Sequence, residues 1–148
     1  MYQRLLVPVD GSELSERAIE ESIRLARQLG AEIAGFVAEP AVALPGNIGM
    51  NPAHYERAAT AHEERTAEHA HKLLGRFAAR AIEAGVTFQG HYVRSSHIDA
   101  AIAEAARERG CDMIVMVTHG RGPFGELLFG SHTKGVMARS KLPVLVLH

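Results

Sequence analysis

The sequence contains little cysteine and no excess of charge of either sign. One cysteine occurs among 148 residues, which excludes an intrachain disulfide and a zinc site built from several cysteines. The 16 Lys and Arg residues nearly balance the 17 Asp and Glu residues, and the formal net charge is −1. Because proteins that bind nucleic acid normally carry a basic surface, we expect no nucleic-acid partner. We expect Cys111 to be a small buried side chain in a reducing environment.

Long apolar segments are also absent. A membrane-spanning helix needs roughly 20 consecutive apolar residues, and no stretch of the sequence approaches that length. The apolar run near Met1 is too short for a signal peptide. We therefore expect no membrane partner and a cytoplasmic location. The hydrophobic residues make up 47% of the chain, and at about 150 residues per domain we expect one domain spanning residues 1–148.

Short apolar runs alternate along the chain with stretches of helical spacing. The apolar runs predict strands at 3–9, 32–37, 86–93, 113–117 and 143–147. The helical spacing predicts helices at 12–29, 53–84, 96–109 and 131–139, the first three ending at Gly30, Gly85 and Gly110. Parallel strands need long crossover connections, so this alternation indicates a doubly wound α/β fold. Its expected form is an open five-stranded parallel sheet with helices on both faces.

Three finer features are also predicted from these segments. Residues 38–52 contain three prolines and two glycines, which indicates a surface excursion. In the helix at 53–84, only the later part has a firm apolar stripe, so we expect the early part to project from the body. Ser96 followed by Asp99 fits a capping box at the start of the next helix.

The last predicted strand, at 143–147, is continuously apolar. A terminal strand in an open sheet forms an edge, and an exposed apolar edge invites association with another chain. A second copy of this chain would cover the edge, so we expect a homodimer formed through this strand.

The densest chemical signal is the segment Thr118-His-Gly-Arg-Gly-Pro-Phe-Gly-Glu-Leu-Leu-Phe-Gly-Ser-His-Thr133. Its four glycines fall within eleven residues and permit close approach of a ligand, while the N–H groups of a following helix favour an anion such as phosphate. The alternative is a flexible connection whose glycines only form turns. Ligands of open α/β sheets bind beyond the strand ends where the strand order reverses, so we expect Asp10 and Gly120 to face one crevice.

Two common nucleotide motifs fit this segment poorly. Residues 120–125 match G-x-G-x-x-G, but Pro123 interrupts the helix that should begin there, and no acidic residue follows at the required distance. Residues 125–131 have the glycine spacing of a P-loop but lack the lysine after the second glycine. NAD or FAD binding and Walker-type phosphoryl transfer are therefore disfavoured.

Taken together, these segments resemble the universal stress protein family. The nucleotide motif of that family is G-x2-G-x9-G followed by Ser or Thr, and Gly120, nine further residues, Gly130 and Ser131 reproduce its second half. The flanking segments that agree are Val7-Pro-Val-Asp-Gly-Ser12, Ile114-Val-Met-Val-Thr-His-Gly120 and Lys141-Leu-Pro-Val-Leu-Val146. The resemblance spans nearly the whole chain and is weakest over residues 38–70.

The resemblance implies a strand order of 3-2-1-4-5 and a bound adenine nucleotide, ATP or alternatively AMP or ADP, with Mg²⁺ or Mn²⁺ held mainly by the phosphates. It places adenine near the ends of the first two strands and the phosphates in the last glycine loop. The positions that it implies for the nucleoside are Pro8, Asp10 and Val37, and those for ribose and phosphates are Gly120, Gly130, Ser131, His132 and Thr133. The further candidate positions around the nucleotide are Val9, Met116, Val117, His119 and Arg121.

Individual candidates leave alternatives open. Val117 stands where the family has the first glycine of its motif, and its branched side chain would crowd the base or ribose. Asp10 either accepts hydrogen bonds from ribose or adenine, or only caps the first helix. Val37 would act through its backbone. His119 either meets phosphate when protonated or fixes the loop through a backbone hydrogen bond.

Nine histidines raise the question of a metal site. His62 and His69 are seven residues apart and could share a helix face, but no paired cysteines and no HExxH motif accompany them. We expect no dedicated metal site and no catalytic residues.

Three functions follow in order of preference. The first is a dimeric module that binds an adenine nucleotide and acts in stress response and signalling. The second is a nucleotide-free dimeric interaction protein of the same fold, in which Val117 blocks the base. The third, a slow ATPase, is disfavoured because the sequence shows no set of base, arginine clamp and metal carboxylates.

Overall fold

A computed structural model describes residues 1–40, 51–118 and 131–148 of the chain. The strands in these ranges are β1 (Arg4–Pro8), β2 (Glu32–Glu39), β3 (Phe88–Arg94), β4 (Met113–Val117) and β5 (Val144–Leu147). The helices are α1 (Glu13–Leu29), α2 (Pro52–Glu83), α3 (Ile98–Glu108) and α4 (Ser131–Arg139). The strands pair in parallel in the order β3-β2-β1-β4-β5, so the predicted sheet and its strand order are confirmed.

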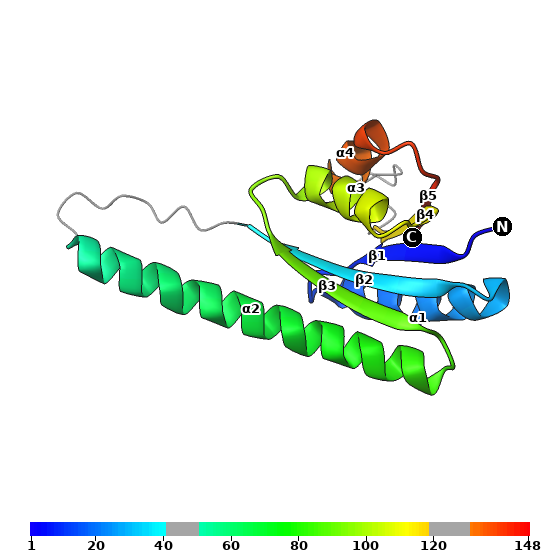
Figure 1. Cartoon of the computed structure of the whole chain (residues 1–148), viewed down its shortest axis with the longest axis horizontal. Coiled ribbons are helices and arrows are strands. Elements are labelled where there is room, and N and C mark those ends of the chain that lie inside the picture. Colours follow the sequence, from blue (N-terminus) through cyan, green and yellow to red (C-terminus); the bar gives the residue numbers. More distant parts are fainter. Residues whose placement is uncertain (41–50, 119–130) are drawn as a thin grey trace, which may run out of the picture.

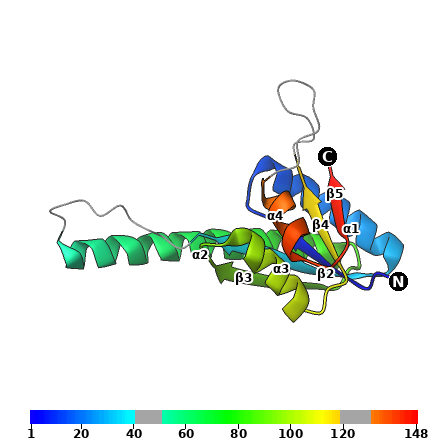
Figure 2. The ribbon, with the colours of Figure 1, turned by 90° about the horizontal axis from the view of Figure 1, so that it is seen from above.

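Helices cover both faces of the sheet, α1 and α2 on one and α3 and α4 on the other (Figure 1, Figure 2). Side chains alternate between the faces along each strand. In β1, Leu5 and Val7 belong to the core under α1 and α2, whereas Leu6 belongs to the core under α3 and α4. Burial on both faces explains why the strands are short continuous apolar runs in the sequence. Cys111 is buried as expected, and burial raises the pKa of its thiol to about 11.

Helices α1, α2 and α3 end at the predicted glycines. The φ angles of these glycines are 65° at Gly30, 76° at Gly85 and 64° at Gly110. In this left-handed conformation the following N–H groups turn back to the last carbonyls of the helix, as the N–H of Val86 does with the carbonyl of Ala81. Because that N–H is already bonded, β3 begins at Phe88, and the predicted start at Val86 is wrong.

The predicted surface excursion at 38–52 is too long at both ends. β2 continues to Glu39 because this residue still pairs with Arg94 of β3. α2 begins at Pro52, since proline is tolerated in the first turn of a helix, where its missing N–H would be unbonded.

The predicted capping box at the start of α3 is also wrong. The N-cap is His97, and it makes no side-chain capping bond. Instead of reaching back to Ser96, the Asp99 side chain contacts His132 of α4. A tertiary contact has therefore replaced a local one.

α2 is long, and only its second half lies on the sheet. Its 32 residues span about 48 Å at the usual rise per residue. The buried residues of α2 are Ala70, Leu73, Leu74, Phe77 and Ala81. The earlier turns extend beyond the sheet (Figure 1), as expected. None of the helices in the described part of the chain has the length and apolarity needed to cross a membrane.

Candidate functional site

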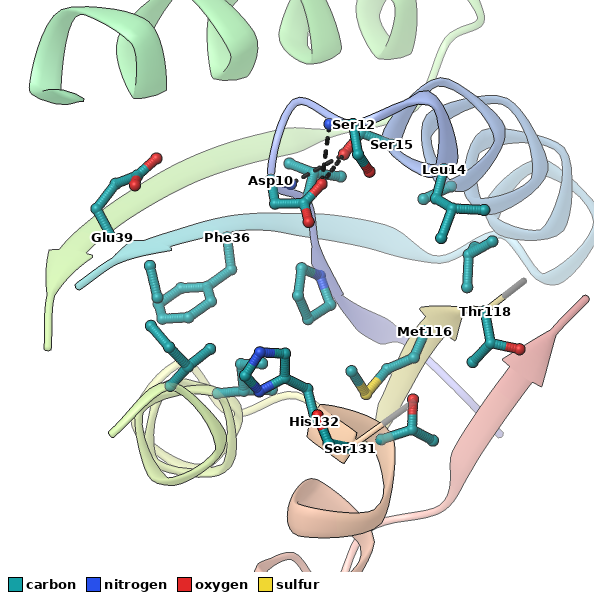
Figure 3. Close-up of a pocket in the computed structure, with 18 of the residues that line it drawn as sticks. Asp10, Ser12, Leu14, Ser15, Phe36, Glu39, Met116, Thr118, Ser131 and His132 are labelled. Atoms are coloured by element: carbon teal, nitrogen blue, oxygen red, sulfur yellow. Dashed lines mark hydrogen bonds between the residues drawn. The ribbon is translucent and has the colours of Figure 1, made fainter. Parts of the chain in front are cut away.

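A cavity of about 680 Å³ lies beyond the carboxyl ends of β1 and β4 (Figure 3). The strand order reverses here, because the chain adds β2 and β3 on one side of β1 and places β4 and β5 on the other. Ligands of open α/β sheets bind at such a reversal. The predicted site residues that line the cavity are Pro8, Val9, Asp10, Met116, Val117, Ser131, His132 and Thr133. The fold thus brings together three segments that are far apart in the sequence.

The remaining predicted site residues lie elsewhere or outside the described ranges. Val37 is fully buried in the core under α1 and α2 and does not line the cavity. Its neighbours Phe36 and Ala38 do line it, because successive residues of a strand point to opposite faces. The backbone role of Val37 stays a prediction. The candidates outside the described residues are His119, Gly120, Arg121 and Gly130.

The Asp10 carboxylate is held in the turn between β1 and α1 (Figure 3). Its Oδ1 accepts hydrogen bonds from the N–H of Ser12 and the hydroxyl of Ser15, each at 2.9 Å. The Ser15 oxygen in turn accepts the N–H groups of Asp10 and Gly11, also at 2.9 Å. The carboxylate that borders the cavity is therefore fixed before any ligand arrives.

Two opposing effects set the charge of Asp10. Burial opposes ionisation, but hydrogen bonds from Ser12 and Ser15 outweigh it and hold the pKa of the carboxyl below its ordinary value. The group is therefore a carboxylate at neutral pH and acts only as an acceptor. The N-cap of α1 is Ser12, so Asp10 stabilises the turn before the helix while also forming part of the cavity wall.

The cavity combines apolar walls with polar groups. Phe36, Ile102 and Met116 offer apolar surface against which a planar base can pack. The first turn of α4 faces the cavity through Ser131, His132 and Thr133, and N–H groups at a helix start favour a phosphate. Within the described ranges, no three or more His, Cys, Asp or Glu side chains are grouped to hold a metal ion.

The whole chain also matches one family of proteins. Residues 1–148 align with the model of the universal stress protein family. The chain belongs to the universal stress protein family. It is 30% identical to a universal stress protein of Thermus aquaticus over 146 residues, which cover 99% of this chain and 98% of the relative. It is 27% identical to the universal stress protein YxiE of Bacillus subtilis over 150 residues, 99% of each chain.

Solved structures of universal stress proteins share this fold. UspA from Lactobacillus plantarum superposes with a TM-score of 0.80 at 19% identity and covers 99% of this chain and 98% of its own. A universal stress protein in complex with cAMP has a TM-score of 0.64 at 26% identity, with coverage of 99% and 97%. An Arabidopsis thaliana family protein with AMP bound has a TM-score of 0.64 at 15% identity, with coverage of 98% and 90%.

Val117 is the clearest departure from the family's nucleotide motif. Its side chain is partly buried against the core under α1 and α2, and it also borders the cavity. A branched side chain therefore stands at the end of β4, at the position where the resemblance implies a glycine.

Several cavity residues were not predicted from the sequence. They are Ser12, Leu14, Ser15, Ala18, Phe36, Ala38, Glu39, Pro40, Ile98, Ile102 and Thr118. Phe36, Ala38 and Glu39 lie in the second half of β2, and Pro40 and Thr118 follow β2 and β4, so a position at the carboxyl end of a strand is a signal that could have identified these five. Ser12 is the N-cap of α1, and Leu14, Ser15 and Ala18 lie in its first two turns. Ile98 and Ile102 belong to α3, and nothing in the sequence indicates that this helix reaches the cavity.

Proposed function

We propose that this chain binds an adenine nucleotide in the cavity between β1, β4 and α4. The observation that carries the proposal is that Asp10 and the first turn of α4 border one cavity at the reversal of the strand order. The base packs on the apolar wall near the ends of β1 and β2, Asp10 accepts hydrogen bonds from ribose or adenine, and the phosphates meet the start of α4. Relatives of the same fold with cAMP or AMP bound support this assignment.

ATP is the nucleotide that we propose first, with AMP and ADP as alternatives. Mg²⁺ or Mn²⁺ would enter with the phosphates, held mainly by phosphate oxygens and water. The proposed event is binding rather than turnover. Among the described residues that line the cavity there is no arginine to stabilise a transferring phosphoryl group.

A homodimer in stress signalling completes the proposal. β5 is at the edge of the sheet, and all four of its residues are only partly buried. An apolar strand edge of this kind favours pairing with a second copy. Nucleotide binding would shift such a dimer toward one conformation, and a partner protein in the cytoplasm would recognise the surface of that conformation.

The position of Val117 favours one alternative function. If its side chain excludes the base, the chain is a nucleotide-free dimeric interaction protein of the same fold. The two functions differ in whether a nucleotide stabilises the native state, as any ligand specific for that state must.

Calorimetric titration with AMP and ATP, with and without Mg²⁺, tests the proposal in matched variants. Asp10→Asn replaces the carboxylate that borders the cavity with a neutral amide. Asp112→Asn changes a carboxylate that accepts the N–H groups of Gln3 and Arg4 at the opposite end of β1. We expect Asp112→Asn to bind like the wild type and Asp10→Asn to bind about tenfold more weakly, because a hydrogen bond to a charged group is lost. Wild-type protein that binds neither nucleotide would support the nucleotide-free alternative.

A further inference from the structure

His132 and Asp99 form a close pair between α4 and α3 at the edge of the cavity. Nδ1 of His132 lies 2.6 Å from Oδ1 of Asp99. A carboxylate can only accept a hydrogen bond, so Nδ1 carries the proton in this pair. The imidazole projects from the start of α4 into the cavity, toward Phe36 (Figure 3). The second ring nitrogen, Nε2, is thereby left for a ligand.

Two features keep the Asp99 carboxylate in position. It lies in the first turn of α3, where the N–H groups of the helix favour a negative charge. It also rests on α4 at Gly135, where a Cβ atom would overlap the carboxylate of Asp99. Glycine at this position therefore gives Asp99 the room to reach His132.

His132 also has a distinct place in the electrostatics of the cavity. The described lining residues include the carboxylates of Asp10 and Glu39 and no Lys or Arg. Among these residues, His132 is the one side chain that can carry a positive charge. Asp99 supplies the compensating negative charge on the side of the ring away from Nε2, and Lys134 is the next basic residue on α4.

We infer that Asp99 is a positioning residue that orients His132 so that its Nε2–H donates a hydrogen bond to a phosphate of the bound nucleotide. The inference rests on the proposed function and adds a specificity to it. Because Nδ1–H is already donated to Asp99, an Nε2–H is present only on the doubly protonated ring, which in the complex lies between two anions, Asp99 and the phosphate. The pair makes the cavity discriminate between a phosphorylated nucleoside and the free nucleoside.

Titration with AMP and with adenosine separates this role from a general structural one. In His132→Ala, we expect AMP affinity to fall about tenfold, since a charge-assisted hydrogen bond is lost, while adenosine affinity stays within about twofold. We expect Asp99→Ala to lower the affinity for AMP as well. A variant that only disturbs the fold would weaken both ligands together.

The backbone offers an independent variant with a matched control. Gly135→Ala forces the Asp99 carboxylate out of its place, so it should reproduce the AMP-specific loss without changing either member of the pair. Gly75→Ala introduces the same substitution in α2, where nothing lies within 4 Å of the added Cβ, and should leave both affinities unchanged. Long-range ¹H–¹⁵N spectra of the imidazole should show a proton on Nδ1 in wild type without ligand and protons on both ring nitrogens with AMP bound, and Asp99→Ala should lose this pattern.

The outcomes separate the inference from the proposed function. If wild type binds AMP and adenosine but His132→Ala leaves the ratio of the two affinities unchanged, the inference is wrong and the proposed function stands. If wild type binds neither ligand, the proposed function fails. In that case inorganic phosphate is titrated against the imidazole signals: shifts in wild type that vanish in Asp99→Ala sustain the inference, and unmoved signals overturn it.

Discussion

At the scale of single residues, the Ser15 hydroxyl holds the turn that presents Asp10. The residue is 3% exposed, and its hydroxyl accepts two backbone N–H groups and donates to the Asp10 carboxylate. One small side chain therefore satisfies the backbone of the turn and fixes a charged group on the cavity wall. No local propensity rule marks it, because a serine in the first turn of a helix is ordinary.

We expect Ser15→Ala to lower the free energy of unfolding by about 2 kcal/mol, since two part-buried N–H groups lose their acceptor and the Asp10 carboxylate loses a donor. The matched control is Ser22→Ala in the same helix. Ser22 is fully buried, but its hydroxyl donates only to the carbonyl of Ile19 in its own helix, so this substitution should cost much less. Urea denaturation of both variants measures the difference. Equal losses in the two variants would contradict the role given to Ser15.

The charge of Asp10 should appear in the pH dependence of stability. Its pKa is lower in the folded chain than the ordinary 3.8, so the ionised carboxyl stabilises the fold above that value. The contribution is lost as the pH falls below about 3.8 toward the folded-state pKa. The stability difference between wild type and Asp10→Asn should therefore shrink below that pH and be constant above about pH 5. A stability difference that grows on acidification would show that folding does not lower the pKa of Asp10.

At the scale of elements, glycines act in two opposite ways in the helices. Gly30 has a φ of 65° and ends α1, whereas Gly75 lies inside α2 with open space where a Cβ would be. Substitution of glycine by alanine should therefore change the free energy of unfolding in opposite directions at the two positions.

Gly75→Ala should raise the free energy of unfolding by about 1 kcal/mol, because alanine is the better helix former. Gly30→Ala should lower it by about 1 kcal/mol, because the left-handed conformation is strained for alanine. Thermal unfolding followed by circular dichroism measures both changes. A stabilising effect at Gly30 would mean that the end of α1 does not need the left-handed turn.

The elements themselves were predictable because each rests on local chemistry. Apolar runs, helical spacing and the terminal glycines placed all nine elements of the described ranges. Two errors occurred where another part of the fold intervened: β2 gained residues through pairing with β3, and the Asp99 side chain contacts His132 instead of capping α3. The starts of β3 and α2 differ for local reasons, an N–H already bonded to the end of α2 and a proline in the first turn of α2.

At the scale of the whole molecule, the site depends on packing that the sequence does not display. The segments after β1 and β4 could be expected to meet, because the carboxyl ends of neighbouring parallel strands lie together. The approach of α3 could not, since Ile98 and Ile102 carry no motif and the motif expected for Asp99 was a capping box. These residues reach the cavity or His132 through the packing of α3 beside α4. Sequence reasoning therefore found the cavity residues at the ends of β1 and β4 and at the start of α4, and missed those of β2, α1 and α3.

The proposed dimer gives a prediction at the same scale. Val146→Lys puts a charge on the β5 edge and should yield a monomer, because charged edge strands resist pairing. Met137→Lys is the control: Met137 is 54% exposed and belongs to α4 rather than to the edge strand. Sedimentation velocity, with circular dichroism to verify folding, compares the two variants. A wild type that sediments as a monomer, or a Val146→Lys variant that stays dimeric, would rule out this interface.

The central claim is that the cavity holds an adenine nucleotide. The most direct measurement identifies the small molecules that are purified together with the protein. The protein is purified without added nucleotide and denatured, and the released small molecules are identified by chromatography and mass spectrometry. A second portion is melted with and without ATP and Mg²⁺. We predict ATP or AMP in near-stoichiometric amount, or an empty protein whose melting temperature rises with ATP. An empty protein with an unchanged melting temperature would contradict the account and favour the nucleotide-free interaction protein.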